Sequence, residues 1–175
     1  MDINKEELIN SLPTKWKDIT LQQYITLVEL LPSQIEHGES ESVFMIKVVS
    51  AFIFAFTGHN VQDLKLNASE VMKTINKFNA FQDDTDKTIE VNEKEIKSID
   101  EIDYDSFIKF LKYQEMKTFS VYPQMISLML TSPVSPSDII QWDMQKVNSF
   151  FLRLLEILNQ YLEASQHYLM QKMKL

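Results

Sequence analysis

The sequence predicts a mainly α-helical protein, and three observations support this fold class. Only two of the 175 residues are glycine, so the many tight turns of an all-β protein are hard to build. Apolar residues recur at three- and four-residue spacing over most of the chain, and residue pairs typical of helix caps precede several of these stretches. The hydrophobic content of 45% is normal for a globular chain. We expect a helical domain of six to eight helices, with one small β-hairpin insertion at about residues 87–98 and a long C-terminal helix.

The first predicted helices are defined by their capping residues. An opening helix is expected over residues 2–10, with Asp2 as its N-cap. Thr20 lies three residues before Gln23, which is the spacing of a capping box, and this pair predicts a helix that ends at Pro32. The second of these helices carries an apolar stripe at helical spacing, so it is expected to bury one face.

The next segment, Val43–Phe56, is apolar on nearly every side. Its length favours a helix over a strand, and its composition predicts that this helix is central and buried on most sides. Ser42 is the expected N-cap and Gly58 the C-terminal stop. A further helix is predicted after Asn67, because Asn67 and Glu70 repeat the spacing of a capping box.

The stretch Gln82–Asp105 carries most of the charge of the chain. It holds ten acidic residues and three lysines, a net charge of −7 out of −8 for the whole chain. Residues 88–91 and 95–97 alternate apolar and polar around Asn92-Glu93, which predicts the β-hairpin. The charge has two interpretations: it keeps a solvated strand edge from pairing, or it mimics DNA or docks a basic partner. We expect the first.

The acidic stretch divides the single predicted domain, residues 1–175, into two helical halves. The N-terminal half is residues 1–81, the acidic hairpin segment is 82–105, and the C-terminal half is 106–175. Asp103 is the expected cap of the helix that follows the acidic segment. Asp143 is the expected cap of a last helix that runs to the end of the chain, about 45 Å at 1.5 Å per residue.

The sequence shows no pattern of catalytic or metal-binding residues. There is no cysteine, and His37, His59 and His167 lie far apart without partners at metal-ligand spacing, which is typical of surface and loop histidines. Residues 83–86 resemble the start of a calcium loop but lack its central glycine. The carboxylates leave a paired-carboxylate hydrolase open, but nothing near them suggests a sugar-binding groove. We therefore predict no enzymatic activity, no catalytic residues, no cofactor and no metal.

Composition also limits the partners. With 17 Lys and Arg residues against 25 acidic residues, the chain lacks the basic surface that nucleic-acid binding needs. The longest apolar run, residues 48–56, is too short to cross a bilayer. The opening residues lack the pattern of a signal peptide. We expect a soluble, non-secreted protein that binds no nucleic acid, no membrane and no small-molecule substrate.

The end of the last helix is the predicted partner-contact surface. Its first half is apolar on most sides and is expected to be core. Beyond Ser165 it becomes amphipathic and rich in methionine, which is typical of a helix that packs on a partner; the alternative is further core. The predicted contact residues are Tyr161, Tyr168, Leu169, Met170 and Met173.

Three segments together resemble a known group of proteins. Trp16–Tyr24 has the pattern Trp-x-x-Ile-Thr-Leu-x-Gln-Tyr, Ile89–Ile96 is short and charged, and Asn148–Leu152 has the pattern Asn-x-Phe-Phe-Leu in a late helix. This arrangement resembles small helical virion and tail-assembly proteins of tailed bacteriophages, including crAss-like phages. The chain departs from that pattern at Asn92-Glu93, where Asn-Gly is expected, and in a longer stretch after Ser165.

The resemblance implies a non-enzymatic virion structural or assembly protein that acts by packing against other phage proteins. These partners would be portal, tail or capsid subunits or further copies of the chain itself. The implied location is the virion, or the host cytoplasm during phage assembly. Two alternatives stay open: a tail assembly chaperone that is absent from the mature particle, and an acidic binding module or inhibitor that presents residues 82–105 to a basic partner.

Overall fold

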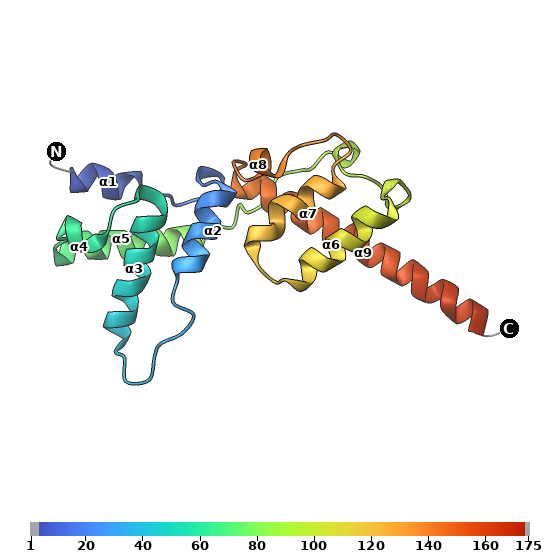
Figure 1. The fold of residues 1–175 in the computed structure, drawn as a ribbon. Helices are drawn as coiled ribbons and strands as arrows, with labels where there is room; N and C mark the ends of the chain where they lie inside the picture. The colour runs from blue at the N-terminus through green and yellow to red at the C-terminus, as the bar shows by residue number, and fades with distance from the viewer. Residues whose placement is uncertain (1–3, 174–175) are drawn as a thin grey trace. The chain divides into compact units, whose positions relative to one another are not determined.

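The computed structural model describes the backbone of residues 4–173 and the side chains of residues 4–160, apart from those at positions 93 and 99. In this part of the chain the protein is mainly α-helical, with nine α-helices, four short 3₁₀ turns and no β-strand (Figure 1). The chain divides into two compact units, residues 1–87 and 88–175, with the boundary inside the acidic segment. The mainly α fold class is confirmed, but the nine helices of the described residues exceed the six to eight expected. The organisation as a single domain stays a prediction.

Unit 1 is built around a central helix, α3. This helix packs against α2 and α5, and α1 packs against α5. The helices of unit 1 are α1 (Lys5–Ser11), α2 (Leu21–Leu30), α3 (Glu41–Thr57), α4 (Val61–Leu64) and α5 (Ala68–Gln82).

The two capping boxes and the C-terminal glycine predicted for unit 1 are confirmed. The Thr20 hydroxyl accepts a hydrogen bond from the Gln23 N–H at 3.3 Å, and the Gln23 side chain accepts one from the Thr20 N–H at 2.9 Å. Asn67 and Glu70 make the same reciprocal pair at the start of α5. Gly58 ends α3 with φ of 71°, a left-handed conformation that favours glycine. These local signals define the helix ends in unit 1.

Two predicted caps were wrong by two residues. Asn4, not Asp2, caps α1, and its side chain accepts a hydrogen bond from the Glu7 N–H; Asp2 itself lies outside the described residues. Ser40, not Ser42, caps α3, which therefore begins at Glu41. In both places two residues of types that favour the N-cap lie two positions apart, so residue preference alone does not choose between them.

A cluster of aromatic rings holds the core of unit 1. Phe52 is fully buried in α3, with its ring centroid 5.1 Å from that of Phe56 and 5.2 Å from that of Phe78. Phe81 completes the cluster at 6.0 Å from Phe52. Edge-to-face and tilted ring pairs of this kind stabilise a core beyond the area they bury.

The last residues of unit 1 are tied back to its first loop through Trp16. The Asp84 carboxylate accepts a hydrogen bond from the Trp16 N–H at 2.8 Å, and the Lys87 ammonium lies 5.2 Å from the centre of the Trp16 ring. The same ring stacks on Phe81 at 6.2 Å. The first acidic residues are therefore part of the packing of unit 1.

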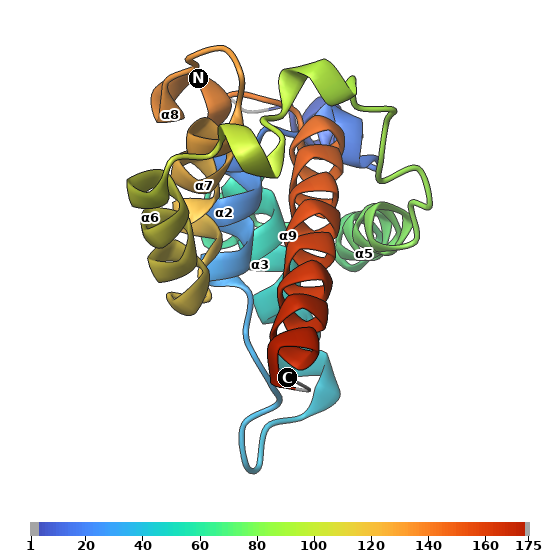
Figure 2. The same ribbon diagram turned by 90° about the vertical axis from the view of Figure 1, so that its right-hand side faces the viewer.

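Unit 2 contains the long helix α9. Helix α7 packs against α6, α8 and α9, and Figure 2 shows α7 between α6 and α9. The predicted long C-terminal helix is confirmed, since α9 runs for 30 residues. None of the helices in the described part of the chain has both the length and the apolar character needed to cross a bilayer. The helices of unit 2 are α6 (Tyr104–Glu115), α7 (Tyr122–Met129), α8 (Pro136–Ile139) and α9 (Met144–Met173).

The predicted β-hairpin at residues 87–98 is not present. The segment instead contains the 3₁₀ turns Glu93–Glu95 and Ile99–Glu101, and Ile96 forms a single antiparallel bridge with Leu130. Ile96 is buried, but its pairing partner is distant in the sequence and not within the predicted hairpin. A two-residue turn of Asn-Glu also lacks the positive-φ preference that closes a tight hairpin.

Backbone hydrogen bonds attach this segment to the last residue of α7 and to the loop that follows it. The Lys97 N–H donates to the Met129 carbonyl at 2.9 Å, and the Thr131 N–H donates to the Glu95 carbonyl at 3.0 Å. Further back, the Ile89 N–H donates to the hydroxyl of Ser149 on α9 at 2.7 Å. The part of the acidic segment after residue 88 thus belongs to unit 2, where its backbone groups hold it through hydrogen bonds.

Candidate interaction surface

Helix α3 is covered over only part of its length. Its second half supplies the buried residues Val48, Val49, Ala51, Phe52 and Ile53. Its first turns are different: Val43 is exposed and Ile46 retains 53% of its accessible surface. The prediction that residues 43–56 are buried on most sides is therefore wrong for the first half of this helix.

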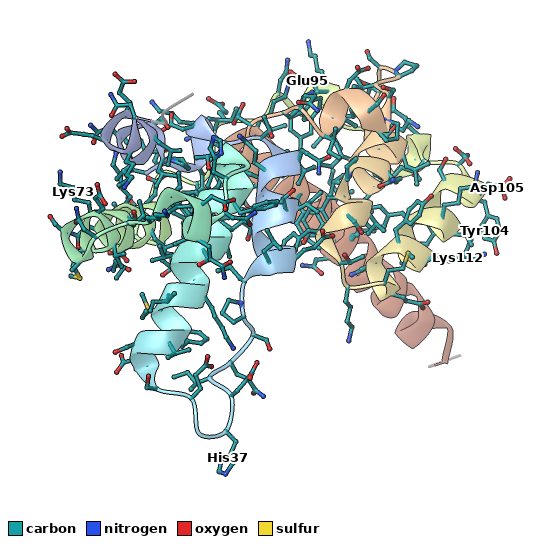
Figure 3. All side chains as sticks on the ribbon, turned by 60° about the vertical axis from the view of Figure 1, so that its left-hand side comes forward. His37, Lys73, Glu95, Tyr104, Asp105 and Lys112 are labelled. Carbon is teal, nitrogen blue, oxygen red and sulfur yellow. The ribbon has the colours of Figure 1, made fainter. Side chains whose placement is uncertain are left out.

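The reason is the length of the neighbouring helix. Helix α3 has 17 residues and α2 has 10, so their lengths are about 25 Å and about 15 Å at 1.5 Å per residue. The shorter helix cannot cover the whole of the longer one. The chain leaves α2 through the loop that carries His37 at its tip, which adds no helix against the first turns of α3 (Figure 3).

An apolar groove lies between the first turns of α3 and those of α5. Its volume is about 370 Å³, and its lining residues are Glu41, Ser42, Met45, Ile46, Val71 and Ile75. Next to it on α5, Met72 is 56% exposed. A volume in this range is comparable to that of ligand pockets, but the walls are aliphatic and carry few polar groups. This groove is a surface suited to apolar side chains of a partner.

The segment that leads into α3, together with the first turns of this helix, is mainly acidic. The Lys47 ammonium binds Glu39 at 2.9 Å and Glu36 at 3.2 Å, and these ion pairs attach the loop before α3 to the helix. The hydrogen bond with Lys47 lowers the pKa of Glu39, and the same bond raises the pKa of Lys47. Residues 33–47 hold three acidic residues and one lysine, a net charge of −2.

The predicted partner-contact residues lie in α9, but their side chains lie outside the described residues. Helix α9 continues through Met173, so the backbone that carries them is helical. Their side chains follow Gln160, the last position at which side chains are described. The prediction that they contact a partner therefore stays a prediction. These residues are Tyr161, Tyr168, Leu169, Met170 and Met173.

Several carboxylates of the acidic segment bind nearby backbone groups. Asp103 caps α6 and accepts hydrogen bonds from the hydroxyl and the N–H of Ser106, which lower its pKa. Glu101 accepts from the N–H and hydroxyl of Ser98, and its pKa is lowered for the same reason. These residues have structural roles, which weakens the argument that the whole segment is a docking surface for a basic partner.

Asp84 gives a testable pH dependence. The hydrogen bond from the Trp16 N–H is the main cause that lowers the pKa of Asp84 below its ordinary value of 3.8. A carboxyl group with a lowered pKa in the folded state stabilises the protein above its unfolded pKa, and this contribution is lost as the pH falls through the folded value. We expect Asp84→Ala to lower the Tm at neutral pH, and the difference from wild type to narrow below about pH 4.

Thermal melts followed by circular dichroism from neutral to acidic pH measure this difference. Asp83→Ala is the matched control, because it removes the same charge one residue earlier, at the C-cap of α5. A Tm difference for Asp84→Ala that is as large in acid as at neutral pH would show that packing, not the charge, is responsible.

No group of three or more His, Cys, Asp and Glu residues able to hold a metal ion occurs in the part of the chain that the structure describes. His37 and His59 are exposed residues in loops, and the side chain of His167 lies outside the described residues. A second small cavity, of about 150 Å³, lies in unit 2 beside Tyr113 and Phe119. Its lining includes four aromatic residues and Lys117.

Sequence reasoning placed the interaction surface on α9 and missed the α3/α5 groove. The sequence does carry a signal for this groove. Val43–Ile46 extends the apolar pattern of α3 further than a ten-residue helix such as α2 can cover. Met72, an apolar residue on the polar side of α5, was a second signal.

Comparison with known proteins identifies no relative. No protein-family model matches the chain, and searches of curated proteins and of solved structures found no significant match.

Proposed function

We propose that this chain is a non-enzymatic structural or assembly protein of a tailed bacteriophage, which acts by packing against other virion subunits. The observation that carries the proposal is the apolar groove between α3 and α5, beside the exposed residues Val43, Ile46 and Met72. Exposed apolar surface of this kind is typical of protein–protein interaction sites and of ligand-binding grooves. The phage assignment itself derives from the resemblance of Trp16–Tyr24 and Asn148–Leu152 to such proteins.

The proposal predicts a specific requirement for the groove. In the phage that encodes this chain, we expect the protein to be present at a fixed copy number in purified particles. Ile46→Glu introduces a charge into the groove at a half-exposed position, so it should leave the fold intact but strongly reduce incorporation.

Quantitative mass spectrometry of purified particles measures incorporation, and circular dichroism verifies the fold. Met116→Glu is the matched control, because Met116 is 60% exposed at the end of α6 and does not line the groove. Particles that form normally and contain equal amounts of wild type and Ile46→Glu would contradict the proposal.

The same experiment addresses the assembly chaperone. A chaperone is required for particles to form but is absent from the finished particle. Loss of particles without the protein, together with its absence from wild-type particles, would therefore favour this second function. In that case the groove binds a subunit before assembly instead of within the virion.

The other alternative function is an acidic binding module that presents residues 82–105 to a basic partner. Its support is the carboxylates of this segment that are exposed, among them Glu95 and Asp105, which Figure 3 shows pointing outward. It predicts binding of a basic partner that weakens steeply with salt. Charge reversal at these two positions would abolish such binding and leave incorporation into particles unchanged.

A further inference from the structure

We propose that the α3/α5 groove receives the C-terminal end of α9 from a second copy of this chain. The proposal rests on the proposed function, packing between virion subunits, and names the partner as the chain itself. It joins a groove in unit 1 to a helix end that belongs to unit 2.

The shape of the groove fits a helix. Its two walls are helices, and the apolar residues Met45 and Ile46 on one wall face Val71 and Ile75 on the other across about 370 Å³. A groove between two helices commonly binds an amphipathic helix whose apolar residues recur at three-, four- and seven-residue spacing. A methionine in the wall adapts readily to the side chains it receives.

Helix α9 continues beyond the last of its described side chains. Leu158 is the last of its buried residues in the described part of the chain, and the helix continues to Met173. These further residues correspond to about 22 Å of helix at 1.5 Å per residue. Figure 1 shows α9 continuing past α6 and α7, which belong to the same unit.

The sequence of this helix end provides the apolar residues that such a groove requires. Leu162, Leu169 and Met173 follow one another at spacings of seven and four residues, which is the periodicity of one helical stripe. Tyr168 and Met170 add further apolar surface. Leucine, methionine and tyrosine suit a groove whose lining includes Met45, Ile46, Val71 and Ile75.

The charges of the two surfaces are opposite. Residues 162–175, which carry this stripe, contain two lysines, Lys172 and Lys174, and one acidic residue, Glu163, a net charge of +1 in a chain whose net charge is −8. Residues 33–47 carry a net charge of −2, and Glu41 lines the groove. Opposite charges beside an apolar contact accelerate association and fix its orientation.

An interface of this kind is heterologous, because the groove and the helix end are different surfaces of one chain. Each copy then offers one groove and one helix end, so association continues from copy to copy and gives a ring if it closes or a filament if it does not. A symmetric dimer through one shared surface is not expected.

Complementation between two variants tests this arrangement. Ile46→Glu disables the groove and keeps the helix end, whereas deletion of residues 166–175 removes the helix end and keeps the groove. We expect wild type to form concentration-dependent oligomers and each variant alone to be monomeric by size-exclusion chromatography with light scattering. The two variants mixed in equal amounts should form a dimer and nothing larger, because only one complementary contact remains.

A peptide experiment measures the contact directly. A fluorescein-labelled peptide with the sequence of residues 159–175 should bind the truncated protein with one-to-one saturation in fluorescence anisotropy. We expect Ile46→Glu in the protein, or Leu169→Glu in the peptide, to weaken binding about tenfold or more, and Met116→Glu to have no effect. Circular dichroism of each variant verifies that the fold is retained.

A mixture that stays monomeric, or a peptide that does not bind, would overturn the inference. Wild type that is monomeric at every concentration would do the same. The proposed function fails separately: incorporation into particles that depends on Ile46, without self-association, would keep the groove as a virion contact and assign it to a different subunit.

Discussion

Replacement of Phe52 by alanine is expected to destabilise the protein by about 3–5 kcal/mol. Phe52 is fully buried, and its ring contacts those of Phe56, Phe78 and Phe81. The alanine removes the central ring of this cluster and leaves a cavity that a close-packed core fills only in part. Because domains are stable by only about 5–15 kcal/mol, a loss of this size is a large part of the total.

Urea denaturation followed by circular dichroism measures the change in the free energy of unfolding. Ile46→Ala is the matched control, since Ile46 lies on the same helix but is about half exposed, and we expect it to cost less than about 1 kcal/mol. Equal effects of the two substitutions would contradict the assignment of the second half of α3 to the core and of the first half to the surface.

Replacement of Leu154 by alanine should destabilise unit 2 by about 2–5 kcal/mol. Leu154 is 1% exposed on α9, two residues from Leu152, which is 44% exposed. Leu152→Ala changes the same residue type on the same helix, so the helix propensities of the two variants change alike and only burial differs. We expect Leu152→Ala to change the free energy of unfolding by less than a quarter as much as Leu154→Ala, which keeps it within about ±0.5 kcal/mol of wild type.

Hydrogen exchange read by mass spectrometry locates the effect. Leu154→Ala should lower amide protection in residues 104–160 and leave α3 and α5 protected, because α9 packs against α7 within its own unit. Protection lost equally in both units would show that the two units unfold together, which is what the predicted single domain requires.

The parts of the fold that depend on neighbouring residues were predictable from the sequence. A capping box joins two residues three positions apart. Thr20 with Gln23, and Asn67 with Glu70, are therefore sufficient to predict where α2 and α5 begin. The N-cap Asp103 of α6 and the left-handed Gly58 at the end of α3 also depend only on neighbouring residues. The long apolar-periodic run of α9 was predictable for the same reason.

The errors occurred where the partner of a residue is distant in the sequence. Ile96 alternates with polar neighbours as a strand residue does, but its pairing partner is Leu130 and not a residue of its own segment. Alternation reports which face of an extended segment is buried and says nothing about what covers it. A hairpin pairs two neighbouring segments, so it is the pairing that local alternation alone predicts.

The candidate site illustrates the same limit. The apolar character of Val43–Ile46 was visible in the sequence, but whether these residues are core or surface depends on how far α2 and α5 extend along α3. Hydrophobicity records what a residue would gain by burial, whereas the coverage of a helix is set by the lengths of its neighbours. The groove therefore required the structure.

The link between Trp16 and Asp84 has a consequence for synthesis on the ribosome. Every helix that packs in unit 1 lies within the first 87 residues, and this hydrogen bond joins the end of the unit to its first loop. At about 5–20 residues per second, the remaining 88 residues take roughly 4–18 s to translate, while N-terminal units already fold. The helices that line the groove are thus complete on the nascent chain before the end of α9 is made, so under the proposed contact the first helix end available to it belongs to a copy already finished.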